Sequence, residues 1–143
     1  MKEIQTRSQQ MMKLALELVQ EVAEKYPDKD DPVRKAYGSL CHNFPPFVRT
    51  CGLCQAVAFS VDKASAADSE NKDDQSRGMA HRLLLEHVAK VLNIPSRDDL
   101  LDHLLSANLE EYMLLTRQVL SSWVYFKRFA RSILKVEPGG NNA

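Results

Sequence analysis

Apolar residues recur three or four positions apart along most of this chain, and this spacing restricts the fold more than any other feature. The pattern places apolar side chains on one face of an α-helix. No segment alternates apolar and polar residues in the way that is typical of a half-buried strand. We therefore predict an all-α protein. The first helix, expected over residues 5–26, shows the spacing at Met11, Leu14, Ala15, Leu18, Val19, Val22 and Tyr26.

Prolines predict the boundaries of the next two helices. Pro32 at a first helical position indicates a second helix, which we expect to run to about His42. Proline lacks a backbone donor and disfavours helix at the residue before it, so Asn43–Pro46 should break the chain. A third helix is then expected from Phe47. Gly52 would lie inside it, where close packing of another helix would account for a glycine.

The later part of the chain predicts three more helices. Residues 65–76 have low hydrophobicity and bury too little surface to offset chain entropy, so we expect a mobile loop before the fourth helix. Ser96 indicates the N-cap of a short fifth helix. Asn108 is expected to cap a long last helix that continues to about Val136. Residues 137–143 are expected to form a disordered tail.

Length and charge place limits on the class of protein. A chain of 143 residues suits one domain, residues 1–143, built as a bundle of about six helices. Lysine plus arginine equals aspartate plus glutamate at 19 each, so net charge does not favour nucleic acid. We find no signal peptide or spanning segment, and expect no membrane association. For the same reason we expect a cytoplasmic protein, and three cysteines, an odd number in a reducing compartment, argue against a disulfide framework.

The motif Cys51-Gly52-Leu53-Cys54 allows three interpretations. A C-x-x-C can be a redox pair or half of a zinc site. A redox pair usually sits in a βαβ unit, and a zinc site needs further ligands that do not follow here. We favour buried structural thiols, because unpaired cysteine is among the most buried residue types.

No catalytic constellation is visible. The four histidines share no spacing with carboxylates that would build a catalytic or metal site, and we expect them at the surface or the edge of the core: His42, His81, His87 and His103. No serine lies in a nucleophile elbow. We expect no enzyme, no catalytic residue, no metal, no cofactor and no small-molecule substrate.

The last helix carries cations on the side opposite its apolar face. At ~100° per residue, Arg117, Arg128, Arg131 and Lys135 fall within roughly 60° of one another, with Lys127 at the margin. Acidic residues are scarce on this stripe beyond its first turn, so we expect its charges to be free of neutralising neighbours. One interpretation is a solvated helix end whose cations suit the helix dipole. The other is a surface that contacts phosphates. The expected apolar face consists of Tyr112, Leu115, Val119, Trp123, Phe126, Ala130 and Ile133.

Two segments together resemble a known family. They are FPPFVRTCGLCQAVAF at residues 44–59 and the last helix with YMLLT at 112–116 and WVYFKRFA at 123–130. The pair is similar to the small subunit of the type III-B CRISPR Cmr effector complex. Cys51 stands where that family often has asparagine and Cys54 where it often has glycine, so the resemblance implies that the C-x-x-C motif is incidental.

The resemblance implies a subunit without catalysis of its own. Such subunits stack in several copies along the inner filament of an RNA-guided complex, beside other Cmr subunits, and help to hold the duplex of guide RNA and target RNA in antiviral defence. Matching positions make Arg49, Lys127, Arg128 and Arg131 candidates for RNA contact. The stripe adds Arg117 and Lys135, and the place after the Ala-Phe motif adds Lys63.

An alternative function needs no nucleic acid. A helical adaptor for protein–protein interaction would use an apolar groove near Phe44, Phe47 and Trp123.

Overall fold

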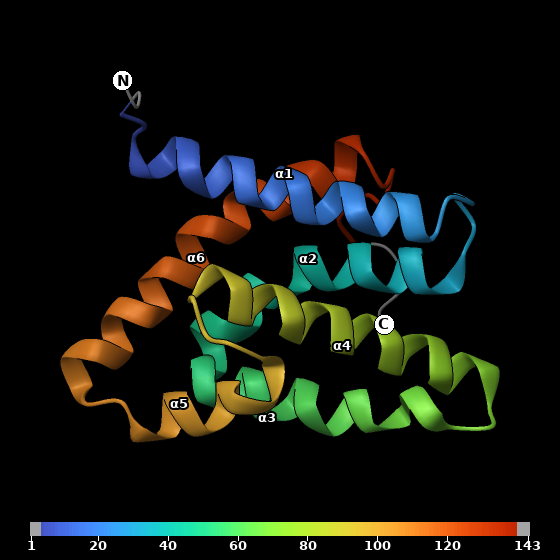
Figure 1. Ribbon diagram of the computed structural model, residues 1–143. Coiled ribbons are helices and arrows are strands. Elements are labelled where there is room, and N and C mark those ends of the chain that lie inside the picture. The colour runs from blue at the N-terminus through green and yellow to red at the C-terminus, as the bar shows by residue number, and fades with distance from the viewer. Residues whose placement is uncertain (1–3, 140–143) are drawn as a thin grey trace.

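The computed structural model describes residues 4–139, which form six α-helices and two short 3-10 helices, without strands (Figure 1). The predictions of an all-α fold and of a long last helix are confirmed. In chain order the elements are α1 (Arg7–Lys25), α2 (Pro32–Cys51), α3 (Leu53–Ala64), η1 (Ser65–Asp68), α4 (Lys72–Val91), η2 (Arg97–Asp99), α5 (Leu100–Ser106) and α6 (Leu109–Ser132).

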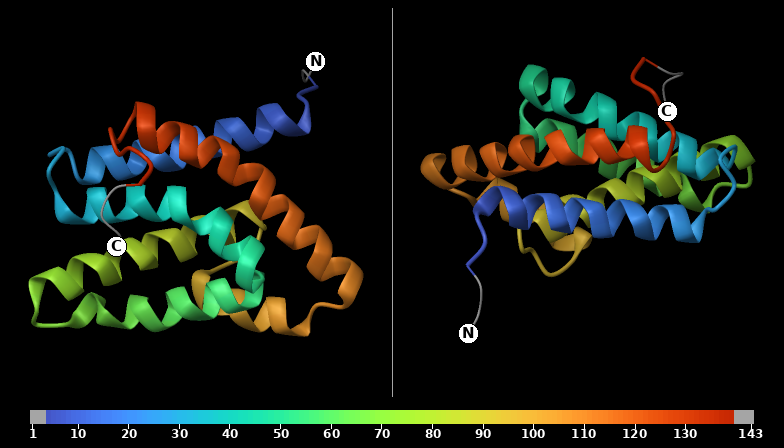
Figure 2. Two further views of the ribbon diagram at one scale, coloured as in Figure 1. Left: turned by 180° about the vertical axis from the view of Figure 1, so that it is seen from behind. Right: turned by 90° about the horizontal axis from the view of Figure 1, so that it is seen from above.

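Helix α2 lies at the centre of the bundle. It packs against α4 and α3 on one side and against α6 on the other, while α1 lies along α6. Seen from behind, the order from bottom to top is α3, α4, α2 and then the C-terminal half of α6 (Figure 2, left). The short α5 sits against α3 and leads into α6. Within residues 4–139, this arrangement leaves one side of α6 exposed.

Aromatic side chains from α2 and α6 form the centre of the core. Tyr37, Trp123 and Phe126 have no exposed surface. The rings of Trp123 and Phe126 stack with centroids 4.1 Å apart, and Phe44 packs on Trp123 at 5.2 Å. Burying each of these side chains is worth roughly 1.5–3 kcal/mol or more. The predicted apolar face of α6 is therefore the buried one.

The expected break at Asn43–Pro46 is wrong, because α2 continues through both prolines to Cys51. Each proline removes a helical hydrogen bond at a cost of about 3 kcal/mol, and α2 bends in its second half (Figure 2, left). Large apolar side chains on both sides of the prolines are buried against neighbouring helices and offset that cost: Tyr37, Leu40, Phe44 and Val48.

The boundary between α2 and α3 lies instead at Gly52. Its φ of 87° and ψ of 158° belong to a region that only glycine adopts readily. The Gly52 N–H still donates to the Val48 carbonyl at 2.8 Å, which closes the last turn of α2. Gly52 is thus required for its backbone conformation and ends a helix, whereas the sequence pattern predicts it inside one.

Residues 65–76, expected to be a loop, are mostly helical. Ser65–Asp68 form η1, and α4 begins at Lys72. The Asn71 side chain accepts hydrogen bonds from the backbone N–H groups of Asp73 and Asp74, at 2.9 and 3.2 Å. An N-cap with acidic residues in the first turn stabilises a helix start that buries little surface. The mobility of this segment stays a prediction.

Helix α6 ends at Ser132, four residues earlier than expected. The next four residues, 133–136, cross α2, and we call them the C-terminal strap. The buried Arg34 guanidinium donates to the carbonyls of Ile133 and Leu134, at 3.0 and 3.3 Å, and so satisfies groups that a longer helix would have bonded internally. His42 Nε2 lies 2.8 Å from the Val136 carbonyl oxygen. Of the predicted tail, 137–139 are exposed, and 140–143 lie outside the described residues.

The strap fits into α2 at a glycine, which gives a stability prediction. A Cβ built on Gly38 would lie 2.5 Å from Val136 Cγ2, so we expect Gly38→Ala to displace the strap. Overpacking of this kind costs ~1–3 kcal/mol, and better helix propensity returns part of it, so urea unfolding should show a net loss of about 1–2 kcal/mol.

A double variant identifies the cause of that loss. Combined with Val136→Gly, the Gly38→Ala change should cost less than the sum of the two single changes, because the collision is gone. Lys35→Ala, at an exposed position on the same helix, should change stability by less than about 0.5 kcal/mol. Strictly additive losses in the double variant would contradict the steric explanation.

Candidate nucleic-acid interface

The first turn of α6 is held by a cap and by a contact with the α2–α3 junction. The Asn108 side chain accepts a hydrogen bond from the Glu111 N–H at 2.9 Å. The Tyr112 hydroxyl accepts one from the Cys54 N–H at 3.0 Å. With its apolar side buried in the core, the helix holds its opposite side in solvent.

The exposed side of α6 carries arginines and apolar residues together. Arg117 and Arg128 are both exposed and lie about 20° apart around the axis. Met113 and Val124 share this arc and are 54% and 53% exposed. In the part of the chain that the structure describes, neither arginine forms an ion pair. We call these four residues, Met113, Arg117, Val124 and Arg128, the α6 face.

Three other cations predicted for this stripe are paired, outside the helix or half-buried, and we do not include them in the α6 face. Arg131 lies on the same arc, but its Nε is 3.1 Å from a Glu137 carboxylate oxygen, so its charge is partly neutralised. Lys135 lies beyond the end of α6 with a φ of 63°, so it does not continue the helical stripe. Lys127 is half-buried at the margin. The expectation that the whole stripe is free of acidic neighbours is therefore wrong for Arg131.

The two cations outside α6 lie in different places. Arg49 is exposed in the last turn of α2, near the junction that contacts the start of α6. Lys63 is exposed near the end of α3, and its ammonium lies 5.4 Å from the centre of the Phe59 ring. Helices α4 and α2 lie between that end of α3 and the C-terminal half of α6 (Figure 2, left). The structure thus does not bring Lys63 to the α6 face.

The expectation that the cysteines are buried structural thiols is met only in part. Cys41 is buried, and burial raises the pKa of its thiol to about 12. Cys54 is half-buried, but Cys51 is exposed at the end of α2, which contradicts the expected burial of that thiol. Among residues 4–139 no group of three or more histidine, cysteine, aspartate or glutamate side chains could hold a metal ion.

Three of the four histidines are buried, which corrects the expectation of surface or core-edge positions for them. Desolvation by burial lowers the pKa of His87 to about 3, with a smaller effect from Lys90. It lowers the pKa of His81 to about 4, with a smaller effect from Lys63. His87 Nδ1 is hydrogen-bonded to the Tyr37 hydroxyl at 2.5 Å. Both imidazoles are therefore neutral at pH 7 and belong to the packing of α4.

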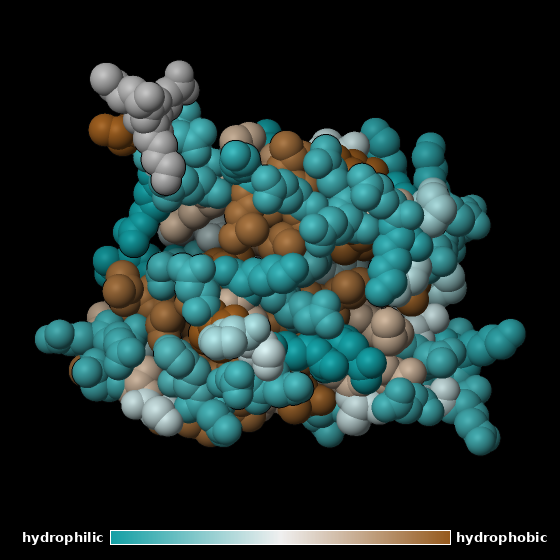
Figure 3. Space-filling model, viewed as in Figure 1, coloured by the Kyte–Doolittle hydropathy of each residue, from teal (hydrophilic) through white to brown (hydrophobic). Residues whose placement is uncertain are grey.

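Exposed leucines that were not predicted from the sequence lie beside the α6 face. Leu105 and Leu109 are 65% and 73% exposed where α5 leads into α6, and Leu114 is also exposed. In Figure 3 hydrophobic patches interrupt the mostly hydrophilic surface between α1 and α4 and beside α6. The helical wheel of α6 contained the signal for Leu114, which lies about 60° from Arg117. Exposed apolar area of this kind marks contact surfaces.

These features define a class: a small all-helical protein whose distinctive surface, a helix face of arginine and apolar side chains, suits binding. Arginine and methionine are enriched at interfaces, and arginine also contacts phosphates. No helix among residues 4–139 combines the length and apolar composition needed to cross a membrane.

Comparisons with known proteins identify the family. Residues 7–133 match the family described as CRISPR-associated protein (Cas_Cmr5). The chain is 33% identical over 132 residues to the "CRISPR system Cmr subunit Cmr5" of Thermus thermophilus, an alignment that covers 92% of this chain and 99% of the relative. The crystal structure of a CRISPR-associated Cmr5 family protein, also from Thermus thermophilus, superposes with a TM-score of 0.69 and 34% identity, covering 93% and 100% of the two chains. The chain belongs to the Cmr5 family, and the resemblance to the small-subunit family is confirmed.

Proposed function

We propose that this chain is a non-catalytic subunit of an RNA-guided Cmr complex in the cytoplasm. In this proposal it stacks with further copies of itself and with other Cmr subunits along the inner filament, and helps to hold the duplex of guide RNA and target RNA. Family membership supports the place in a Cmr complex. The α6 face supports the contact with RNA.

The observation that carries the proposal is the presence of two exposed arginines without ion pairs, within the described residues, on one helix face. Arg117 and Arg128 are separated by about 16 Å along the axis, eleven residues at about 1.5 Å each. Guanidinium groups at such positions contact phosphates and release counterions without reading sequence. Met113 and Val124 beside them would provide apolar contact with a neighbouring subunit. Secondary candidates for RNA contact are Arg49, Lys127, Arg131 and Lys135.

Charge reversal tests the proposal in the reconstituted complex. We expect Arg117→Glu with Arg128→Glu to weaken target-RNA binding by roughly tenfold or more, because phosphate attraction becomes repulsion. The slope of log affinity against log salt concentration should become shallower by about 1.5 for two lost contacts. Filter binding of labelled target RNA over a range of salt concentrations measures both.

The matched control reverses two exposed lysines elsewhere. Lys13→Glu with Lys29→Glu makes the same change in net charge away from the α6 face and should leave RNA binding nearly unchanged. If both double variants bind RNA like the wild type while assembly is intact, the α6 face is not an RNA contact.

The structure supports one part of the adaptor alternative and contradicts another. An apolar pocket does lie beside Phe44 and Phe47, but Trp123 is completely buried in the core and does not line it. An adaptor without nucleic acid predicts that the Arg117 and Arg128 variants lose subunit assembly and show no separate defect in RNA binding.

A further inference from the structure

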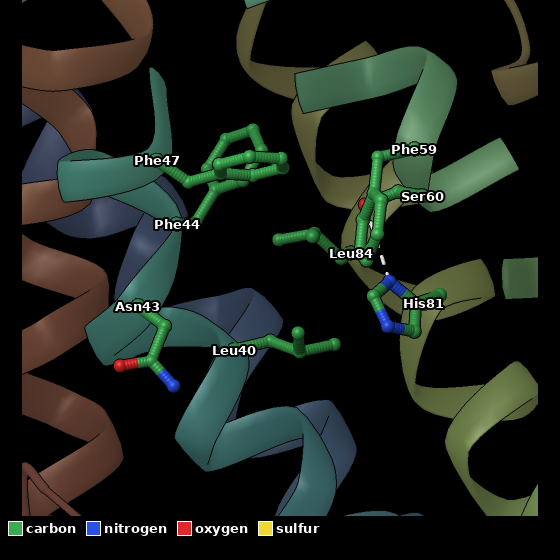
Figure 4. Close-up of a pocket in the computed structure, with 8 residues that line it drawn as sticks. All are labelled: Leu40, Asn43, Phe44, Phe47, Phe59, Ser60, His81 and Leu84. Atoms are coloured by element: carbon green, nitrogen blue, oxygen red, sulfur yellow. Dashed lines mark hydrogen bonds between the residues drawn. The ribbon is translucent and has the colours of Figure 1, made fainter. Parts of the chain in front are cut away.

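A pocket of about 260 Å³ opens between α2, α3 and α4, on a different part of the molecule from the α6 face. Leu40, Phe44 and Phe47 form one wall, and Phe59 and Leu84 face them (Figure 4). Phe59 is 41% exposed, although its ring contacts another aromatic ring, that of Phe47, at 5.2 Å. The exposed apolar wall indicates a surface that a partner covers.

Three polar side chains, Asn43, Ser60 and His81, line this otherwise apolar space. His81 Nδ1 is hydrogen-bonded to the Ser60 hydroxyl at 3.1 Å. The other ring nitrogen, Nε2, has no hydrogen-bond partner among residues 4–139, and Figure 4 shows it on the side of the ring toward Leu40 and Asn43. Because burial keeps the imidazole neutral at pH 7, Nε2 donates or accepts one hydrogen bond, depending on the tautomer.

Size and polarity together select the occupant. The volume is below the ~300–1,000 Å³ of small-molecule and cofactor sites and above the ~150 Å³ that holds benzene, so it suits one aromatic side chain. A nucleobase is read through multiple hydrogen bonds, which a lining of five apolar and three polar side chains supplies less well than it supplies apolar contact. A phenol matches the pocket: its ring fills apolar space and its hydroxyl pairs with either tautomer of His81.

The mouth of the pocket has an unneutralised positive charge. Lys63 lies over the Phe59 ring and forms no ion pair within the described part of the chain. None of the residues that line the pocket is acidic. An occupant with a carboxylate beside its aromatic ring would complement this mouth.

We propose that this pocket binds a tyrosine side chain, flanked by an acidic residue, that a different protein presents. A second copy of this chain does not supply the tyrosine, because one of its four tyrosines, Tyr37, is buried and the other three are half-buried against the core of their own chain. The Tyr112 hydroxyl, for example, is engaged by the Cys54 N–H. The inference goes beyond the proposed RNA contact and does not depend on it, since the pocket and the α6 face share no residue.

Nuclear magnetic resonance titration of the intact protein with acetyl-Glu-Tyr-Glu-amide tests this proposal. We expect millimolar binding that shifts the His81 and Phe59 signals. Replacing tyrosine by phenylalanine in the probe should weaken binding about fivefold through the lost hydrogen bond. Replacing both glutamates by lysine should weaken it further, because Lys63 then repels the probe.

Variants of the protein separate the pocket from non-specific binding. Phe59→Ala and Lys63→Glu should each weaken binding several-fold, while Val61→Ala, equally exposed on the same helix but outside the pocket lining, should not. Lys63→Glu alters only an exposed side chain, so it keeps the test decisive if Phe59→Ala fails to fold. Equal binding of the tyrosine and phenylalanine probes, no effect of Lys63→Glu, or uridine monophosphate shifting these signals while the peptides do not would each overturn the proposal.

Discussion

Lowering the pH from 7 to 5 should reduce the free energy of unfolding by about 4 kcal/mol, before most carboxylates titrate. His81 and His87 are buried on α4 with pKa values lowered to about 4 and about 3, whereas an unfolded histidine titrates near 6.5. Each proton bound by the unfolded chain but not by the folded one costs about 1.4 kcal/mol of stability per pH unit.

The free energy of unfolding falls with falling pH because the unfolded chain binds protons that the folded chain excludes. Well above pH 6.5 both histidines are neutral in both states, so their environment causes no pH dependence there. As the pH falls from 6.5 toward 4, the unfolded chain takes up two protons that the folded chain excludes, and stability falls. Below the folded pKa values the folded histidines also become protonated, and the loss levels off.

Urea unfolding at intervals between pH 7 and pH 5 measures this slope. Replacing His87 with glutamine should lower the slope from about two protons to about one, because one titrating site is gone. Val88→Ala is the control: it makes a cavity beside His87 and lowers stability, but keeps both histidines and should keep the slope. A slope of zero in the wild type would show that the two imidazoles are not buried in the neutral form.

Gly78→Ala should destabilise the protein by roughly 3 kcal/mol, despite the better helix propensity of alanine. A Cβ on Gly78 would lie 2.2 Å from the Ala67 backbone nitrogen and 2.5 Å from the Ala66 carbonyl carbon. Because these are backbone atoms, no side-chain rotation relieves the collision, and η1 must move away from α4. Thermal or urea unfolding of the purified variant measures the loss.

A control on the same helix separates the effect of the steric collision from the effect of helix propensity. Gln75→Ala, at an exposed position one turn earlier, should be neutral or slightly stabilising. Ala67→Gly should not rescue Gly78→Ala, because it removes a Cβ that is not among the colliding atoms. This differs from Gly38, where the collision is with a side chain. Wild-type stability of Gly78→Ala would show that α4 and η1 are not packed this closely.

Local sequence patterns determined most of the helices. The three-and-four spacing predicted α1 and the buried side of α6, and the caps at Asn108 and Ser96 predicted where α6 and the η2–α5 segment begin. These predictions succeeded because helix formation and capping depend on neighbours within one or two turns. The family resemblance likewise rested on short segments of sequence.

The errors arose where distant residues decided the outcome. Pro45 and Pro46 stay inside α2 because the bundle buries the apolar residues around them, a gain that local rules do not include. Helix α6 ends at Ser132 because Arg34, about a hundred residues earlier in the chain, binds the carbonyls that follow. Local propensity cannot foresee such contacts.

The candidate sites show the same division. The helical wheel of α6 placed Arg117 and Arg128 on one face, but only the folded chain showed that Arg131 is paired with Glu137. The pocket joins Phe44 from α2, Phe59 from α3 and His81 from α4, which have no common periodicity in the sequence. The sequence by itself determined which residues each helix could present. The tertiary structure decided which of them are buried, neutralised or left open to a partner, because burial and pairing depend on the packing of helices far apart in the chain.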